Sequence, residues 1–180
     1  MMNIDVNIYP AFRSTVDDSY LLPSRCAPDG KPSEHWRVCH VDREAAILRM
    51  MKEADRGMHC KAYVTMKALV QVEPTLEGLP VEHIRMALLH AFDSSVDSVP
   101  RWQRASLTDC FRRILSFLSH FYSNESLPDF FHTDRNLLTE VQPRLVSRLR
   151  TRLAYLVQHE RELLRVLAKR TPKDGEGDTE

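Results

Sequence analysis

The sequence predicts a mainly helical domain that follows a single β-strand. Two patterns carry this prediction. Apolar residues recur every three or four positions over most of the chain beyond residue 41, and one short segment near the start alternates apolar and polar residues. The composition agrees, because 43% hydrophobic and 28% charged residues among 180 are typical of a soluble globular protein. Five glycines are few for a fold built on many tight turns.

The alternating segment spans residues 3–12 and predicts a strand with one buried face. Ile4, Val6 and Ile8 would lie on that face, and Pro10 would end the strand. A lone strand cannot satisfy its own backbone hydrogen bonds, so we expect its partner to lie outside this chain or in another molecule. Residues 13–35 contain three prolines and are expected to form a loop.

Five helices are predicted after this loop. The first begins at Asp42 and stops at Gly57, and the others cover about 59–73, 81–93, 106–123 and 141–169. Ser106 and Asp109 form a capping box for the fourth helix. The last helix carries a narrow apolar seam that pairs with another helix, either in this chain or in a dimer. The seam consists of Leu145, Leu149, Leu153, Leu156, Leu163 and Leu167.

These patterns divide the chain into four segments. Residues 1–12 hold the strand, 13–40 connect, 41–170 form the helical domain, and 171–180 are an acidic tail expected to be disordered. Equal numbers of basic and acidic residues, 25 each, exclude a strongly basic nucleic-acid arm as the whole protein. No apolar run is long enough to cross a membrane and no signal peptide is visible, so we expect a cytoplasmic location.

The four cysteines give no sign of a metal centre. No two of them have a C-x-x-C spacing, and free thiols in a reducing compartment are expected. His59 and Cys60 are an adjacent pair of soft ligands. A structural zinc site usually needs four convergent ligands in two close pairs, so no zinc is expected.

Four segments follow one another in a recognisable order: the strand at residues 4–8, Trp36-Arg37-Val38, Met66-Lys67-Ala68-Leu69 and Leu127-Pro128-Asp129-Phe130-Phe131. In this order they resemble the Mab-twenty-one family, to which cyclic GMP-AMP synthase belongs. They cover about residues 3–140. The strand at 4–8 resembles the family's Val-Asp-Leu strand, and Trp36-Arg37-Val38 resembles the entry to its helical lobe. The other two are similar to its L-K-x-L stretch and to its L-P-x-F-F…N-L-F stretch. They are Met66-Lys67-Ala68-Leu69 followed by His83, and Leu127-Pro128-Asp129-Phe130-Phe131 followed by Asn136-Leu137-Leu138.

The resemblance implies the helical second lobe of a nucleotidyltransferase-like fold, with one strand left from a missing catalytic lobe. The family's first lobe supplies a Gly-Ser turn and an acidic pair that binds two metals. No glycine here is followed by serine, and Glu176-Gly177-Asp178 stands in the tail. We therefore expect no catalytic residue and no cofactor for this chain. Mg²⁺ or Mn²⁺ and ATP or GTP would belong to a complete nucleotidyltransferase.

The resemblance also implies three site residues. Asp5 falls at the third metal-binding carboxylate, Lys67 at a lysine that contacts nucleotide phosphate, and His83 at a histidine beside the nucleotide. Glu82 stands where the family has its base-stacking tyrosine, which argues against base binding. The zinc ribbon of the family's DNA-sensing members, one histidine and three cysteines, has no counterpart at residues 57–62.

Three functions follow as hypotheses. The first is a non-catalytic interaction or regulatory module, which binds a protein partner or the missing N-terminal lobe. The second is a fragment of a cyclic GMP-AMP synthase-like enzyme that senses duplex nucleic acid. The third is a helical nucleic-acid-binding module that uses the last helix, where residues 144–170 hold eight Lys and Arg against two Glu.

Overall fold

The computed structural model describes residues 11–14, 19–23, 36–94, 105–159, 161–163 and 165. The chain forms two units, residues 1–49 and 50–180, which we describe one at a time. The strand predicted around residues 4–8 and the tail 171–180 lie outside the described residues. Among the helices of the described ranges, none is long and apolar enough to cross a membrane.

The first unit contains a small antiparallel sheet in the order β1-β2-β3. Its strands are β1 (Phe12–Arg13), β2 (Tyr20–Pro23) and β3 (Trp36–Cys39), with Leu21 opposite Phe12 on one side and Val38 on the other. The expectation of a loop over residues 13–35 is wrong for β2. A four-residue strand is too short to show a period of two, and its backbone hydrogen bonds are supplied by neighbours that sequence periodicity cannot identify.

Helix α1 (Val41–Asp55) follows the sheet and crosses the boundary between the units. Its acidic residues Asp42 and Glu44 favour the helix N-terminus. The Tyr20 hydroxyl donates to Asp42 at 3.0 Å. Met51 of this helix is buried, whereas Met50 is 54% exposed.

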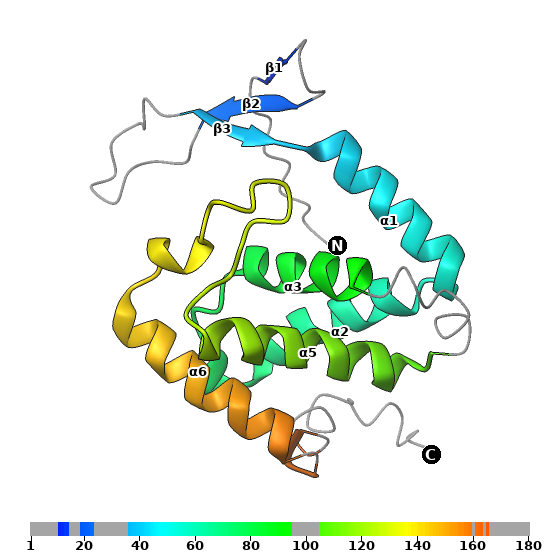
Figure 1. Cartoon of the computed structure of the whole chain (residues 1–180). Helices are drawn as coiled ribbons and strands as arrows, with labels where there is room; N and C mark the ends of the chain where they lie inside the picture. The colour runs from blue at the N-terminus through cyan, green and yellow to red at the C-terminus, as the bar shows by residue number, and fades with distance from the viewer. Residues whose placement is uncertain are drawn as a thin grey trace, which may run out of the picture. The chain divides into compact units, whose positions relative to one another are not determined.

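The second unit is helical and contains most of the predicted elements (Figure 1). Helices α2, α3 and α5 lie within about two residues of their predicted bounds. The elements in chain order are α2 (Met58–Val72), η1 (Pro74–Leu76), α3 (Val81–Asp93), α5 (Leu107–Ser123), η3 (Leu137–Glu140) and α6 (Pro143–Gln158). The mainly helical fold class predicted from sequence is confirmed, with a small sheet in addition.

Helix α5 is the central helix of this unit, because it packs against α2, α3 and α6 (Figure 1). The predicted capping box is confirmed: the Ser106 hydroxyl accepts the Asp109 N–H, and the Asp109 carboxylate accepts the Ser106 N–H, each at 3.1 Å. The helical period of its apolar residues places Leu115 and Leu118 on one face, and both are buried. Each buried leucine stabilises the fold by about 1.5–3 kcal/mol.

The leucine seam of helix α6 packs against α5 of the same chain. Of the two pairings that the sequence left open, within the chain or in a dimer, the structure shows the first. Leu149, Leu153 and Leu156 are fully buried. The expectation of one unbroken helix over 141–169 is wrong, because α6 ends at Gln158, although residues 161–163 and 165 are again helical. The ring of His159 contacts the Tyr155 carbonyl through Nδ1 at 2.9 Å and stacks on the Tyr155 ring, and this contact caps the helix.

The segment between α5 and α6 is held by Asn136. Its Oδ1 accepts the N–H groups of Leu127 and Leu138 at 2.9 and 3.1 Å, and its Nδ2 donates to the Glu125 carbonyl at 2.9 Å. The short loop that resembles the family's L-P-x-F-F stretch therefore has its backbone groups satisfied by one side chain.

Candidate functional site

The turn between α1 and α2 positions the most unusual side-chain cluster of the second unit. Arg56 and Gly57 both have positive φ, 56° and 79°. Glycine adopts this conformation without steric cost, whereas arginine does so rarely. These two residues separate α1 from α2 and place Asp55, the last residue of α1, within hydrogen-bond distance of the first turn of α2.

The Asp55 carboxylate binds three groups at the start of α2. Oδ1 accepts the Gly57 N–H at 2.9 Å, and Oδ2 accepts the His59 N–H at 2.7 Å. Oδ2 also forms a short hydrogen bond with Nδ1 of the His59 ring. A buried carboxylate is tolerated only when it is hydrogen-bonded in this way, and Asp55 is 2% exposed.

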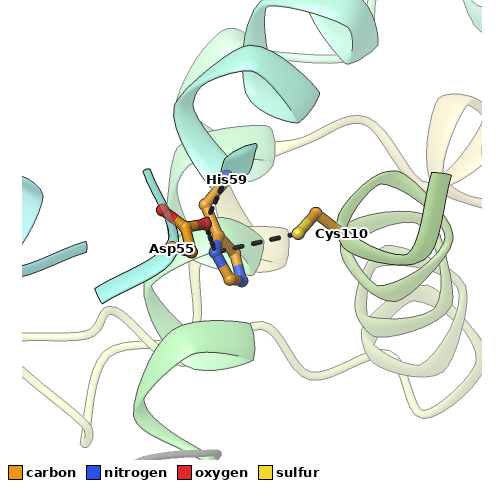
Figure 2. A group of neighbouring side chains, drawn as sticks. All are labelled: Asp55, His59 and Cys110. Carbon is orange, nitrogen blue, oxygen red and sulfur yellow. Dashed lines mark hydrogen bonds and ion pairs between the residues drawn. The ribbon is translucent and has the colours of Figure 1, made fainter. Parts of the chain in front are cut away.

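Cys110 reaches the same histidine from the first turn of α5. Its Sγ lies 3.9 Å from His59 Nδ1 (Figure 2). His59 and Cys110 are both fully buried, and the edge of the histidine ring meets Phe92, with 5.7 Å between ring centroids. Ligand atoms of Asp55, His59 and Cys110 all lie within 4.8 Å of one another. We call these three residues the Asp-His-Cys cluster.

Burial controls the protonation of the Asp-His-Cys cluster. Desolvation lowers the pKa of His59 below its usual 6.5, although the hydrogen bond that the Asp55 carboxylate accepts opposes this, so the ring is neutral at pH 7. Desolvation raises the pKa of the Cys110 thiol to about 11, and the negative charges of Asp55 and Asp109 add to the effect. Cys110 is therefore a protonated thiol at neutral pH when nothing else binds it.

The geometry does not match a nucleophilic triad, whereas the donor atoms suit a metal ion. In a Cys-His-Asp triad the carboxylate and the thiol bind opposite ring nitrogens of the histidine. Here both approach Nδ1. A buried thiol with a raised pKa is also a poor nucleophile. A carboxylate oxygen, an imidazole nitrogen and a sulfur that converge on one point are donors that transition metals accept.

The site residues implied by the family resemblance are placed apart. Lys67 is exposed on α2, with Nζ 5.6 Å from the centroid of the Tyr63 ring. His83 on α3 is 4% exposed, and its Nδ1 lies 2.8 Å from the Tyr122 hydroxyl. One side chain lies at the surface and the other in the core, so they do not form one exposed site. Asp5 lies outside the described residues.

The arginines of α6 are engaged with acceptors of the same unit. Arg152 pairs with Glu73 at 3.1 Å, where both side chains are less than 20% exposed, and Arg150 pairs with Glu125 at 2.7 Å. Arg148 donates to the carbonyl of Glu77. Among the eight basic residues at 144–170, Arg150 and Arg152 are therefore paired with carboxylates.

Two features of the cluster were missed by sequence reasoning. The spacing of Asp55 and His59, four residues apart, was a visible signal, but Cys110 is 51 residues further along and only the packing of α5 on α2 brings it near. Cys60, the soft ligand adjacent to His59 in the sequence, is not in the cluster, because adjacent helical residues point in different directions. Glu53-Ala54-Asp55 is a Glu-x-Asp motif, but Glu53 is exposed while Asp55 is buried.

Comparisons with known proteins agree with the helical fold. A stretch of 137 residues, 76% of this chain, is 26% identical to the mitochondrial dynamics protein MID49 of Xenopus laevis. The match spans 28% of the length of that relative, so the present chain corresponds to little more than a quarter of it. Residues 44–155 match the Mab-21 protein HhH/H2TH-like domain, which is more than half of the chain and includes α2, α3 and α5. The chain belongs to the Mab-21 family.

Proposed function

We propose that this chain acts as a non-catalytic interaction or regulatory module of Mab-21 type. The observation that carries the proposal is the different exposure of Lys67 and His83. A nucleotide site needs the side chains that contact the nucleotide on one accessible surface. Lys67 is exposed, whereas His83 is buried and bonded to Tyr122.

The charge distribution also supports an interaction module over a nucleic-acid-binding one. Phosphate binding by a helix depends on cations that are available to replace counterions. Arg150 and Arg152 of α6 already pair with carboxylates, and Arg152 is largely buried. Breaking these pairs would oppose any gain from phosphate contacts.

The relative MID49 is named as a mitochondrial dynamics protein, which gives the proposal a cellular setting. We infer that the process in which this chain takes part is the shaping of mitochondria. The partner is expected to be a protein or the N-terminal lobe of a Mab-21 protein. In this role the chain needs neither Mg²⁺ nor a nucleotide.

The exposure of Lys67 favours a second candidate, a fragment of a nucleotidyltransferase that binds nucleotide phosphate or duplex nucleic acid. A lysine is a compact point charge on a flexible stem and suits phosphate contact. In that case Lys67→Ala would weaken nucleotide binding, and the binding of duplex RNA would fall steeply with salt.

The test combines biochemistry with imaging. Purified chain is incubated with ATP, GTP and Mg²⁺ or Mn²⁺, with and without duplex RNA, and the products are separated by chromatography. In parallel, mitochondrial networks are imaged in cells that express the wild type, Lys67→Ala, or the core variant Leu115→Asp as an unfolded control. We expect no dinucleotide product, and an altered network that depends on the fold but not on Lys67.

Two results would overturn the proposal. A dinucleotide whose yield follows the purified protein would make the chain catalytic. A cellular effect lost in Lys67→Ala, together with nucleotide binding lost in the same variant, would favour the second candidate. An unchanged network with well-expressed wild type would remove the mitochondrial setting.

A further inference from the structure

We propose that Asp55, His59 and Cys110 form a buried binding site for Zn²⁺. This inference does not depend on the proposed function, and it revises the expectation from sequence that no zinc is bound. It differs from the zinc ribbon of the family's DNA-sensing members, because it uses one carboxylate, one histidine and one cysteine from the α1–α2 turn and α5.

The charges of the donors fit a divalent ion in a buried place. A charge in the protein interior is costly unless it is compensated. The Asp55 carboxylate and the Cys110 thiolate carry two negative charges, and the neutral His59 ring adds none. The sum cancels the charge of Zn²⁺, so the loaded site would be neutral although all three side chains are at most 2% exposed.

The separation of the donors fits tetrahedral coordination. Zinc–nitrogen and zinc–sulfur bonds of about 2.0–2.1 and 2.3 Å, at a tetrahedral angle, separate the two donor atoms by roughly 3.6 Å. Cys110 Sγ and His59 Nδ1 are 3.9 Å apart, so only a small movement of α5 or of the cysteine rotamer is needed. Asp55 Oδ2 would withdraw from Nδ1, while Oδ1 keeps the Gly57 N–H.

Zinc binding changes the position of two protons, one on His59 and one on Cys110. Zinc binds Nδ1 of neutral His59, whose ring proton then resides on Nε2, and it binds the sulfur of Cys110, whose proton is released to solvent. The pKa of about 11 for Cys110 does not prevent this, because coordination deprotonates a thiol outright. The cluster supplies three ligands, and a water molecule completes the tetrahedron.

The chemical softness of the donor atoms indicates which metal ion the cluster would bind. One thiolate and one imidazole favour Zn²⁺ over the hard cations Mg²⁺ and Ca²⁺, which prefer oxygen ligands. Fe–S clusters are typically held by several cysteine thiolates, and this cluster offers one. The rival reading is that Asp55 only caps α2 and that Cys110 is a packed thiol. That reading predicts no affinity for zinc.

The experiment measures zinc and cobalt binding by the full chain. Metal-free protein is dialysed against Zn²⁺, and bound zinc is quantified by mass spectrometry of the elements. We expect one zinc per chain. Cobalt(II) in place of zinc should give a thiolate-to-cobalt charge-transfer absorption, which only sulfur ligation produces. Loss of an outer partner of a metal ligand already weakens binding by about 10–100-fold, so Cys110→Ser should weaken it by about 100-fold or more.

Matched variants separate the site from other thiols. Cys60→Ser changes a half-buried cysteine next to His59 and should leave zinc affinity and the cobalt absorption unchanged. If Cys110→Ser does not fold, a variant with Cys26, Cys39 and Cys60 all changed to serine keeps Cys110 as the sole thiol. Its cobalt absorption should remain. Absence of bound zinc, equal binding by folded Cys110→Ser, or no absorption from the sole-thiol variant would each overturn the proposal.

Discussion

The buried pair of His83 and Tyr122 predicts a loss of stability in mild acid. The Tyr122 hydroxyl lies 2.8 Å from His83 Nδ1, and both residues are buried. Burial lowers the pKa of His83 to about 4 from 6.5, although the negative charge of Glu140 acts in the opposite direction. The folded protein therefore keeps this histidine neutral at a pH where the unfolded chain already protonates it.

The sign and size of the effect follow from proton linkage. Below pH 6.5 the unfolded chain binds a proton that the folded chain does not, so the free energy of unfolding falls as the pH drops from 6.5 towards 4 and then levels off. With these two pKa values the loss between pH 7 and pH 5 is about 2 kcal/mol. In a domain of this size that lowers the melting temperature by roughly 4–8 °C.

The assay is urea unfolding of the wild type and His83→Gln at pH 7 and pH 5. Glutamine retains hydrogen-bonding capacity towards Tyr122 but does not titrate. The wild type should lose about 2 kcal/mol more than the variant between the two pH values. The difference between proteins matters, because His59 also has a lowered pKa and contributes to both. Equal pH dependence in the two proteins would refute the argument and show that His83 is accessible to protons.

Two further predictions concern the core and the ion pairs. Leu115→Ala should lower the free energy of unfolding by about 2–5 kcal/mol, whereas Lys67→Ala should change it by no more than about 0.5 kcal/mol, and denaturant melts that reversed this order would contradict the assigned faces. Glu73→Gln removes the nearer of the two carboxylates that pair with the largely buried Arg152, the other being Glu162 at 3.7 Å, and should destabilise by roughly 1–3 kcal/mol. Glu140→Gln, on a side chain that is 58% exposed, should cost less than about 1 kcal/mol. Equal costs in chemical denaturation would mean that burial of the Glu73 pair is unimportant.

The helices could be predicted from the sequence because each one has a pattern of residue types that involves only neighbouring positions. The apolar positions of α5 recur with the helical period, and Ser106 and Asp109 mark its start by chemistry that involves only neighbouring residues. The buried residues Leu115 and Leu118 followed from that period alone. The order of such segments was also sufficient to indicate the Mab-21 family, which residues 44–155 confirm.

The elements that the sequence did not show depend on partners that are distant along the chain or on single side-chain contacts. Strand β2 is four residues long and is defined by its pairing with β3, not by its own pattern. At the end of α6, the His159 ring contacts the Tyr155 carbonyl. Neither strand β2 nor the end of α6 has a periodic signal in the sequence, because each depends on the position of a single backbone segment or ring.

The candidate metal site shows the same division. The sequence indicated that His59 was a ligand type and offered Cys60 as its neighbour, but residue types alone do not say which side chains converge. Asp55 reaches His59 through a turn with two positive φ values, and Cys110 reaches it through the packing of α5 on α2. Likewise, Lys67 and His83 are close in a sequence motif, yet the helical period exposes one and buries the other against Tyr122. The sequence therefore determined the helices and the family, and the tertiary structure decided which side chains meet, because local order along the chain fixes direction on a helix but not the neighbours across the core.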